Sequence, residues 1–169
     1  MDLFMEHLVQ HKRTGKDLLV MIGIIAGAGI LLSLSTLLLL FPATSGMWLL
    51  AAAAIVFFAV VLIKRTSVEY EYILTNNELD IDRITAKSNR KRVVTVNFAD
   101  IEICAPVSHS GFTSAQGISK TLDCTGKGES GVYFIDFAGE KGKTRVLIEP
   151  PVSYIESVRR FNPSKIFID

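Results

Sequence analysis

Two long uncharged stretches near the N-terminus constrain this chain more than any other feature. Leu18 to Phe41 is a run of 24 residues without a charged side chain, and Met47 to Ile63 is a second run of 17. As α-helices they would measure about 36 Å and about 26 Å, against a hydrocarbon core of about 30 Å. Two buried core helices are the alternative, but they would need a larger core than 169 residues supply. We therefore expect two transmembrane helices.

The two runs are joined so closely that we expect a helical hairpin over residues 17–65. Pro42 and Gly46 lie between them and favour a tight turn, and Trp48 suits the membrane interface. Cations flank the hairpin on both sides and are absent from the turn, so the positive-inside rule puts both flanks in the cytoplasm. These cations are Lys12, Arg13, Lys16, Lys64 and Arg65. We expect a multi-pass protein of the cytoplasmic membrane with both termini cytoplasmic.

Small residues in the hairpin indicate close helix contacts. Gly23 and Gly27 form a GxxxG spacing, and the second run contains four consecutive small residues, Ala51 to Ala54. Small residues allow helix backbones to approach closely. The glycine face either packs on the alanine face within one hairpin, which we favour, or forms a homodimer. Neither run has an ionisable residue in its interior, as a transport pathway usually requires. The hairpin is therefore interpreted as an anchor.

The N-terminal segment, residues 1–16, is expected to be a short cytoplasmic helix. Leu3, Phe4, Leu8 and Val9 have roughly helical spacing, with charged side chains off that face. Such a helix would lie on the membrane surface or simply begin the first transmembrane helix.

From Thr66 onward the pattern changes to a period of two, typical of half-buried strands. Val68, Tyr70, Tyr72 and Leu74 alternate with Glu69 and Glu71 over most of this stretch. Further stretches of strand character cover residues 79–82, 94–98, 101–105, 120–124, 132–137 and 144–149. Pro150 and Pro151 then precede a helical spacing over about 151–161, and we expect the tail at 166–168 to dock on the domain. Residues 66–169 thus predict a cytoplasmic domain of about seven antiparallel strands and one C-terminal helix.

Part of this domain resembles a known family. The segment Tyr72 to Ile81 (YILTNNELDI), the basic tip after it and Asn97 to Ile101 (NFADI) resemble the bacterial pleckstrin-homology-like (PH-like) domains. The resemblance is best over residues 70–105 and extends loosely over 66–161. Such domains often follow a pair of transmembrane helices. The resemblance implies a mainly-β fold in a membrane context and no established activity, and the stretch 106–118 departs from its compact pattern.

The remaining motifs give no catalytic or metal site. The net charge of +1 argues against a nucleic-acid partner, and two cysteines are too few for a disulfide scaffold. Cys104, His109 and Cys124 are too few for a structural zinc site, which needs four ligands. A nucleophilic pair of one cysteine with His109 would need a third group to orient the histidine, and the sequence shows none. Gly126 to Gly131 matches GxGxxG but precedes a strand, which indicates a hairpin loop. We expect no cofactor.

Two groups of charged residues remain. Asp80, Asp82, Asp100 and Glu102 are expected on a solvated sheet face. The basic residues of one hairpin are candidates for anionic lipid headgroups, each contributing about 1 kcal/mol near an anionic surface; a solvated hairpin tip is the alternative. They are Arg83, Lys87, Arg90, Lys91 and Arg92.

The sequence therefore predicts a non-enzymatic, membrane-anchored interaction module. Its β domain would bind a partner protein, a peptide or anionic lipid headgroups at the cytoplasmic surface of the membrane. A peptide would add as a strand to an open sheet edge or bind beside the C-terminal helix. The alternative is an enzyme or enzyme subunit at the membrane that uses the long loop 106–131, with His109 and Cys124 in a ligand pocket.

Overall fold

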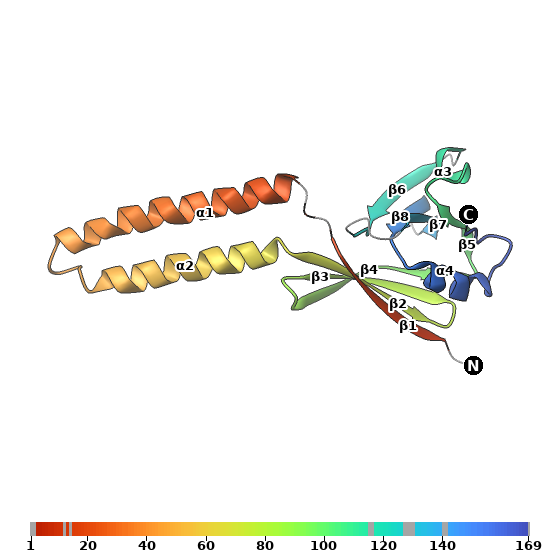
Figure 1. Cartoon of the computed structure of the whole chain (residues 1–169), viewed down its shortest axis with the longest axis horizontal. Coiled ribbons are helices and arrows are strands. Elements are labelled where there is room, and N and C mark those ends of the chain that lie inside the picture. The colour runs from red at the N-terminus through yellow and green to blue at the C-terminus, as the bar shows by residue number, and fades with distance from the viewer. Residues whose placement is uncertain are drawn as a thin grey trace. The chain divides into compact units, whose positions relative to one another are not determined.

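The chain folds as two units, one helical and one mainly β. The computed structural model describes residues 3–11, 13, 15–114, 117–126, 131–139 and 142–168 (Figure 1). The helical unit comprises residues 13–67, and the β unit comprises residues 1–12 and 68–169. The β unit is therefore built from chain on both sides of the helical segment.

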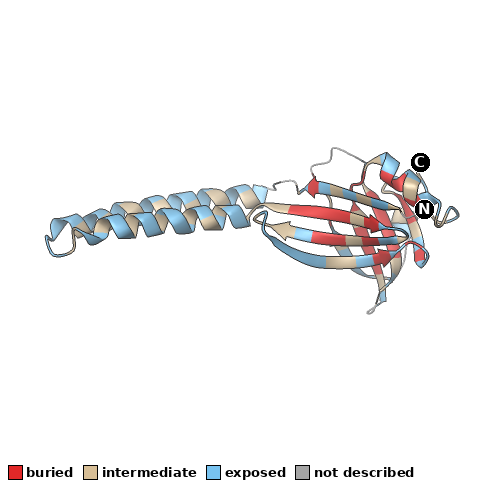
Figure 2. Ribbon diagram, turned by 90° about the horizontal axis from the view of Figure 1, so that it is seen from below, coloured by how far each residue is buried: buried red, intermediate tan, exposed pale blue. Residues whose placement is uncertain are grey.

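The helical unit is the expected hairpin. Helix α1 (Gly15–Ser35) continues as the 3₁₀ helix η1 (Thr36–Leu40), and α2 (Met47–Arg65) follows a turn. The backbone N–H groups of Thr44 and Ser45 each donate to the carbonyl of Phe41 at 3.0 Å and close that turn. None of the described residues in these helices is buried, as the colours of Figure 2 show. Both helical stretches are long and apolar enough to cross a membrane.

The first sheet of the β unit has four antiparallel strands in the order β1-β2-β3-β4. They are β1 (Phe4–Gln10), β2 (Val68–Thr75), β3 (Glu78–Thr85) and β4 (Asn89–Asn97). The expected helix over residues 1–16 is wrong, because residues 4–10 form a strand that pairs with β2 along its whole length. Val9 is buried in the core, whereas Phe4 and Leu8 are 65% and 48% exposed on the opposite face.

The second sheet also has four strands, in the order β5-β7-β8-β6. They are β5 (Ile101–Pro106), β6 (Ile118–Asp123), β7 (Tyr133–Gly139) and β8 (Gly142–Ile148). Strand β6 runs parallel to β8, so the expectation of an all-antiparallel domain is wrong. The long connection between β5 and β6, which includes the short helix α3 (Gly111–Ser114), allows this direction. With β1, the described chain has eight strands.

The C-terminal segment completes the core. Helix α4 (Val152–Arg159) begins after Pro151 and buries Tyr154, Ile155 and Val158. The expected docking of the tail is confirmed, because Ile166 is fully buried and bridges Cys104 on β5. Two backbone hydrogen bonds of 2.8 Å, from Cys104 to Lys165 and from Phe167 to Cys104, fix the tail beside the second sheet.

A buried ion pair holds the inserted connection against the second sheet. Arg145 on β8 donates two hydrogen bonds of 2.7 and 2.8 Å to Asp136 on β7. Its guanidinium carbon lies 4.6 Å from the ring centroids of both Phe112 and Phe134. A third donor, Nη1, binds the carbonyl oxygen of Phe112 at 2.8 Å. One arginine therefore fastens α3 to β7 and β8.

Candidate functional site

The five basic residues expected to contact lipid lie on one hairpin but on two faces. Arg83 is on β3, Lys87 is in the turn, and Arg90, Lys91 and Arg92 are on β4. Side chains alternate between the faces of a strand, and directly opposed residues share a face. Arg83 is opposite Lys91, whereas Arg90 and Arg92 take the other face. The sequence-adjacent cations therefore form two separate sets.

Arg90 and Arg92 are occupied by carboxylates of the neighbouring strands. Arg90 Nη2 lies 2.8 Å from Glu71 Oε2, and Arg92 donates from Nε to Asp82 and lies 2.5 Å from Asp80 Oδ1. Glu71 and Asp82 are only 3% and 4% exposed. Removing the cation from a buried carboxylate is costly, so we assign both arginines to the sheet rather than to a ligand.

The acidic residues of this face are correspondingly not free in solvent. Both Asp80 and Asp82 pair with Arg92. Asp82 is buried, so its expected position on a solvated sheet face is wrong, whereas Asp80 is partly exposed. Glu102, on the other sheet, lies 2.5 Å from Lys143. The pKa of Glu71 is raised by burial and by a hydrogen bond with Glu6, and Arg90 opposes that shift.

All five cations of the hairpin are exposed, and three of them, Arg83, Lys87 and Lys91, lie outside the ion pairs of Arg90 and Arg92; we call these three the basic tip. The described residues offer none of them an ion pair. Ala86 and Lys87 both have left-handed backbone conformations, with φ of 55° and 57°, and are the central residues of a turn in which the Ser88 N–H donates to the Thr85 carbonyl at 3.3 Å. This turn places Lys87 at the extremity of the hairpin.

The basic tip lies at the end of the first sheet where the chain connects to the helical unit. Val68, which opens β2, is directly opposite Thr85 of β3, and the N–H of His11 donates to the Val68 carbonyl at 3.0 Å. Val68 follows the last residue of α2, Arg65, by three positions. Three residues span at most about 11 Å. Both covalent connections to the helices therefore leave the sheet at the end that carries the tip.

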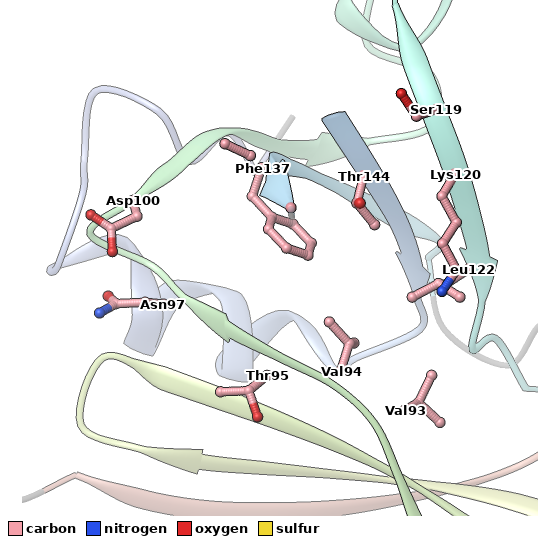
Figure 3. A pocket seen from close by; sticks show the side chains of 12 residues that line it. Val93, Val94, Thr95, Asn97, Asp100, Ser119, Lys120, Leu122, Phe137 and Thr144 are labelled. Carbon is pink, nitrogen blue, oxygen red and sulfur yellow. The ribbon is translucent and has the colours of Figure 1, made fainter. Parts of the chain in front are cut away.

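A groove lies where the two sheets present their edges to each other. In the described chain, β4 pairs only with β3 and β6 pairs only with β8. The cavity between them has a volume of about 860 Å³ (Figure 3), within the range of about 300–1,000 Å³ that is usual for ligand sites. Sequence reasoning missed this groove because it joins strands that are distant in the chain.

A β-bulge gives the groove its apolar wall. The register of β3 and β4 shifts so that Ile81 is opposite Val94 and Asp82 is opposite Arg92, which leaves Val93 unpaired. Val93 and Val94 therefore both face the groove, as Figure 3 shows. Leu122 of β6 and Phe137 of β7 line the other walls, with Lys120 on β6 and Asp100 near the opposite end.

The residues considered for metal or thiol chemistry have structural roles. Cys104 and Cys124 are buried free thiols, and burial raises the pKa of each to about 12. His109 accepts a hydrogen bond from the N–H of Gly111 at 3.0 Å and stacks on Phe167. Within the described ranges, no three His, Cys, Asp or Glu side chains gather as a metal site would require.

Much of the long stretch 106–131 is regular structure. It contributes α3 and β6, while residues 115–116 and the centre of the GxGxxG motif, residues 127–130, lie outside the described residues. Gly126 donates its N–H to Glu149 Oε2 at 2.8 Å, and an added Cβ would lie 1.9 Å from Val9 Cγ1. Close approach of β1 therefore accounts for this glycine, and strand β7 follows the motif as expected.

The glycines of the helical hairpin are not in close contact with its second helix. A Cβ added to Gly23 or Gly27 would meet nothing within 4 Å. Together with Ala54 and Phe58 they border a shallow apolar groove of about 350 Å³ between α1 and α2. Their part in helix packing, within the hairpin or in a homodimer, stays a prediction.

Comparison with protein-family models identifies the family to which this chain belongs. A family model described as Bacterial PH-like domain (DUF6106) matches residues 1–168. The chain belongs to this family. The match includes β1 and the helical hairpin as well as residues 68–168, so both units are part of one PH-like family architecture. No curated protein and no solved structure matches the chain.

Proposed function

We propose that this PH-like protein is a membrane-anchored, non-enzymatic interaction module. The helical hairpin crosses the membrane twice, and the β unit lies at the cytoplasmic surface, where it contacts anionic lipid headgroups through the basic tip and holds a partner. Membership of a PH-like family supports the interaction role.

One observation carries the proposed topology: the strands that flank the hairpin pair with each other. Strand β1 precedes the helices and β2 follows them, and their register runs without a break from Phe4 opposite Thr75 to Gln10 opposite Glu69. Two paired strands lie on the same side of a membrane, so the segment between them crosses an even number of times. Its two apolar helices fit two crossings.

The surface of the helical unit supports membrane insertion. Large apolar side chains are exposed along both helices, including Leu19 at 69%, Leu40 at 71% and Leu50 at 73%. Soluble monomers rarely expose contiguous apolar patches larger than a few hundred Å². Lipid chains can cover such an apolar surface. The backbone polar groups of a helix are already paired by its internal hydrogen bonds. The cations flanking both helices favour the cytoplasmic orientation.

The basic tip supports a contact with anionic headgroups. Lys87 and Lys91 are exposed on the hairpin that ends where the chain enters and leaves the helices. A lysine or arginine close to an anionic surface contributes about 1 kcal/mol, and this contribution falls off within a Debye length. Arg90 and Arg92 are excluded from the contact because their ion pairs hold them in the sheet.

The non-enzymatic role is supported by the state of the candidate groups. Both thiols have a pKa near 12 and are therefore not nucleophilic thiolates at neutral pH. His109 is engaged with Gly111 and Phe167. No contact of the described residues favours the alternative of an enzyme built on the stretch 106–131.

The lipid contact is tested with the full chain in nanodiscs with and without phosphatidylserine. A fluorophore on Ser88→Cys reports proximity to a headgroup-linked quencher, because the native thiols are buried. We expect quenching that requires phosphatidylserine, falls with salt and is lost in the Lys87→Glu/Lys91→Glu variant. Lys120→Glu, which removes an exposed lysine from β6, is the matched control. Quenching that is the same with and without phosphatidylserine, or that persists in the Lys87→Glu/Lys91→Glu variant, would refute the contact between the basic tip and anionic headgroups.

A further inference from the structure

We propose that the groove between β4 and β6 binds an extended peptide segment of a partner. The segment adds to β6 as a further strand of the second sheet, places apolar side chains against Val93, Val94 and Phe137, and carries a carboxylate opposite Lys120. This inference deepens the interaction role of the proposed function and rests on it. It does not depend on the lipid contact of the basic tip.

The free edge of β6 offers hydrogen-bonding groups to such a strand. The N–H of Cys124, directly after β6, donates to the Leu147 carbonyl of β8 at 3.0 Å. Because N–H groups alternate between the two sides of a strand, those of Leu122 and Lys120 also face β8. Those of Thr121 and Asp123 therefore face the free edge. An extended backbone satisfies such groups, whereas an acyl chain leaves them unpaired.

The opposite wall supplies side chains rather than a second ladder. The bulge at Val93 interrupts the edge of β4, and bulges of this kind block regular strand pairing. The same bulge turns two consecutive valines into the groove (Figure 3). An incoming strand would therefore hydrogen-bond to β6 and pack every second side chain against β4. A peptide with apolar residues at alternate positions fits this arrangement.

The charge of the groove specifies one residue on the same face of the incoming strand as its apolar residues, because Lys120 and Leu122 are two positions apart and share the groove face of β6. Lys120 is exposed on the groove side of β6, and no ion pair of the described residues involves it. The acidic residue that lines the groove, Asp100, lies near its opposite end (Figure 3). A carboxylate on the incoming strand would pair with Lys120. A lysine can instead simply guard an exposed edge against pairing, and the experiment separates the two roles.

The test uses the full, isotope-labelled chain in detergent micelles and two blocked heptapeptides. Both peptides have valine at alternate positions and threonine between them, except that the valine position beside Lys120 is glutamate in one peptide and lysine in the other. We expect the glutamate peptide to shift the amide signals of Thr121, Asp123 and Val94 in NMR spectra. It should bind about threefold more tightly than the lysine peptide, which is the difference that one solvent-exposed ion pair makes.

Two variants with matched controls sharpen the test. Lys120→Glu should reverse the preference between the peptides, whereas Lys87→Glu should not. Thr121→Pro removes an N–H that faces the free edge and should abolish the shifts, whereas Thr121→Ala should keep them. The unperturbed amide signals of β2 and β3 would show that each variant is folded.

Several results would overturn the proposal. These are no shift in the groove with either peptide, shifts that Thr121→Pro retains, or a preference that Lys120→Glu leaves unchanged. Signals of the groove that move with protein concentration alone would assign it to a second copy of the chain. Signals that move with added free fatty acid would assign it to a lipid ligand. The nanodisc experiment reads the basic tip alone, so failure of the lipid contact and failure of the peptide site are distinguishable.

Discussion

The helical unit and the β unit use the same apolar residue types in opposite ways. In the β unit, Leu79 and Ile81 alternate with acidic residues and are fully buried. In the helical unit the apolar residues are continuous, and no described residue of α1 or α2 is buried. When apolar residues alternate with polar ones, the chain can bury its apolar face in its own core. When apolar residues are continuous on all sides of a helix, lipid or another protein has to cover them. Pattern, and not composition, thus separates a core from an anchor.

The two units also differ in how they treat charge. The β unit buries charged groups and pairs them, most completely in Arg145 and Asp136. The helical unit keeps its charges at the helix ends, where Lys64 and Arg65 close α2. The stability of the β unit should therefore be sensitive to the loss of one partner of a buried ion pair. Membrane insertion of the helical unit should be sensitive to the gain of a charge.

The largest expected effect comes from breaking the buried pair. Arg145→Met leaves the carboxylate of Asp136, which is fully buried, without its cation. We expect a loss of about 3–5 kcal/mol in the free energy of unfolding, by the usual cost of an unpaired buried charge. Chemical denaturation of the full chain in micelles measures it. The double variant Arg145→Met/Asp136→Leu should recover most of the loss, and a double variant as unstable as the single one would contradict this account.

A charge in the helical unit should have the next largest effect. Ile30, in α1, is 61% exposed and lies within the expected membrane span. Ile30→Arg should disfavour insertion by about 2.5–3.5 kcal/mol, as for arginine at the centre of a transmembrane helix. The fraction of chain that resists alkaline extraction from membranes measures this, with Ile30→Val as control. Full retention of the arginine variant would show that Ile30 does not face lipid.

A smaller effect is expected from one hydroxyl in the core. Tyr72 donates to the Cys124 carbonyl at 2.6 Å and accepts from the Glu149 N–H at 3.1 Å, so it joins β2 to the ends of β6 and β8. Tyr72→Phe should cost about 1–3 kcal/mol, because it leaves buried polar groups unpaired. Tyr154→Phe is the control, since none of the described residues offers the buried Tyr154 hydroxyl a hydrogen-bond partner. Equal losses in the two variants would contradict the assignment.

The smallest expected effect is a change in pH dependence. Burial raises the pKa of Glu71 above its ordinary value of 4.5, so the folded state holds this proton more tightly than the unfolded state. The resulting stabilisation is present at low pH and is lost as pH rises from about 4.5 through the raised pKa. Glu71→Gln should flatten this part of the stability profile, measured by denaturation from acidic to neutral pH. An unchanged profile would show that other carboxylates dominate it, and Glu102→Gln controls for the loss of an exposed carboxylate.

The local pattern predicted most elements but not β1. Residues 3–10 carry apolar side chains on both strand faces, since Phe4 and Leu8 are exposed while Val9 is buried, and this mixture mimics a helical spacing. The partner of β1 lies beyond the whole helical hairpin, and a local pattern does not identify so distant a neighbour. The parallel direction of β6 was not predicted for the same reason. Its partner is β8, and β7 lies between the two strands in the sequence.

The candidate site was only partly predictable. The basic residues were found from their clustering in the sequence, but strand alternation separates Arg90 and Arg92 from Lys91, and carboxylates of β2 and β3 occupy them. The groove depends on the bulge at Val93 and on the position of β6, which are tertiary features. Sequence reasoning therefore identified the charged hairpin and missed the apolar groove beside it.

The most direct test of the account is to determine on which side of the membrane the helical turn and the basic hairpin lie. Ala43→Cys, in the turn between the helices, and Ser88→Cys, in the basic hairpin, are labelled in separate variants with a membrane-impermeant maleimide. The native thiols are buried with a pKa near 12 and serve as a silent background. A double crossing with a cytoplasmic β unit predicts labelling of Ala43→Cys on intact cells and of Ser88→Cys only after permeabilisation. Labelling of both positions from the same side would contradict the membrane-spanning hairpin.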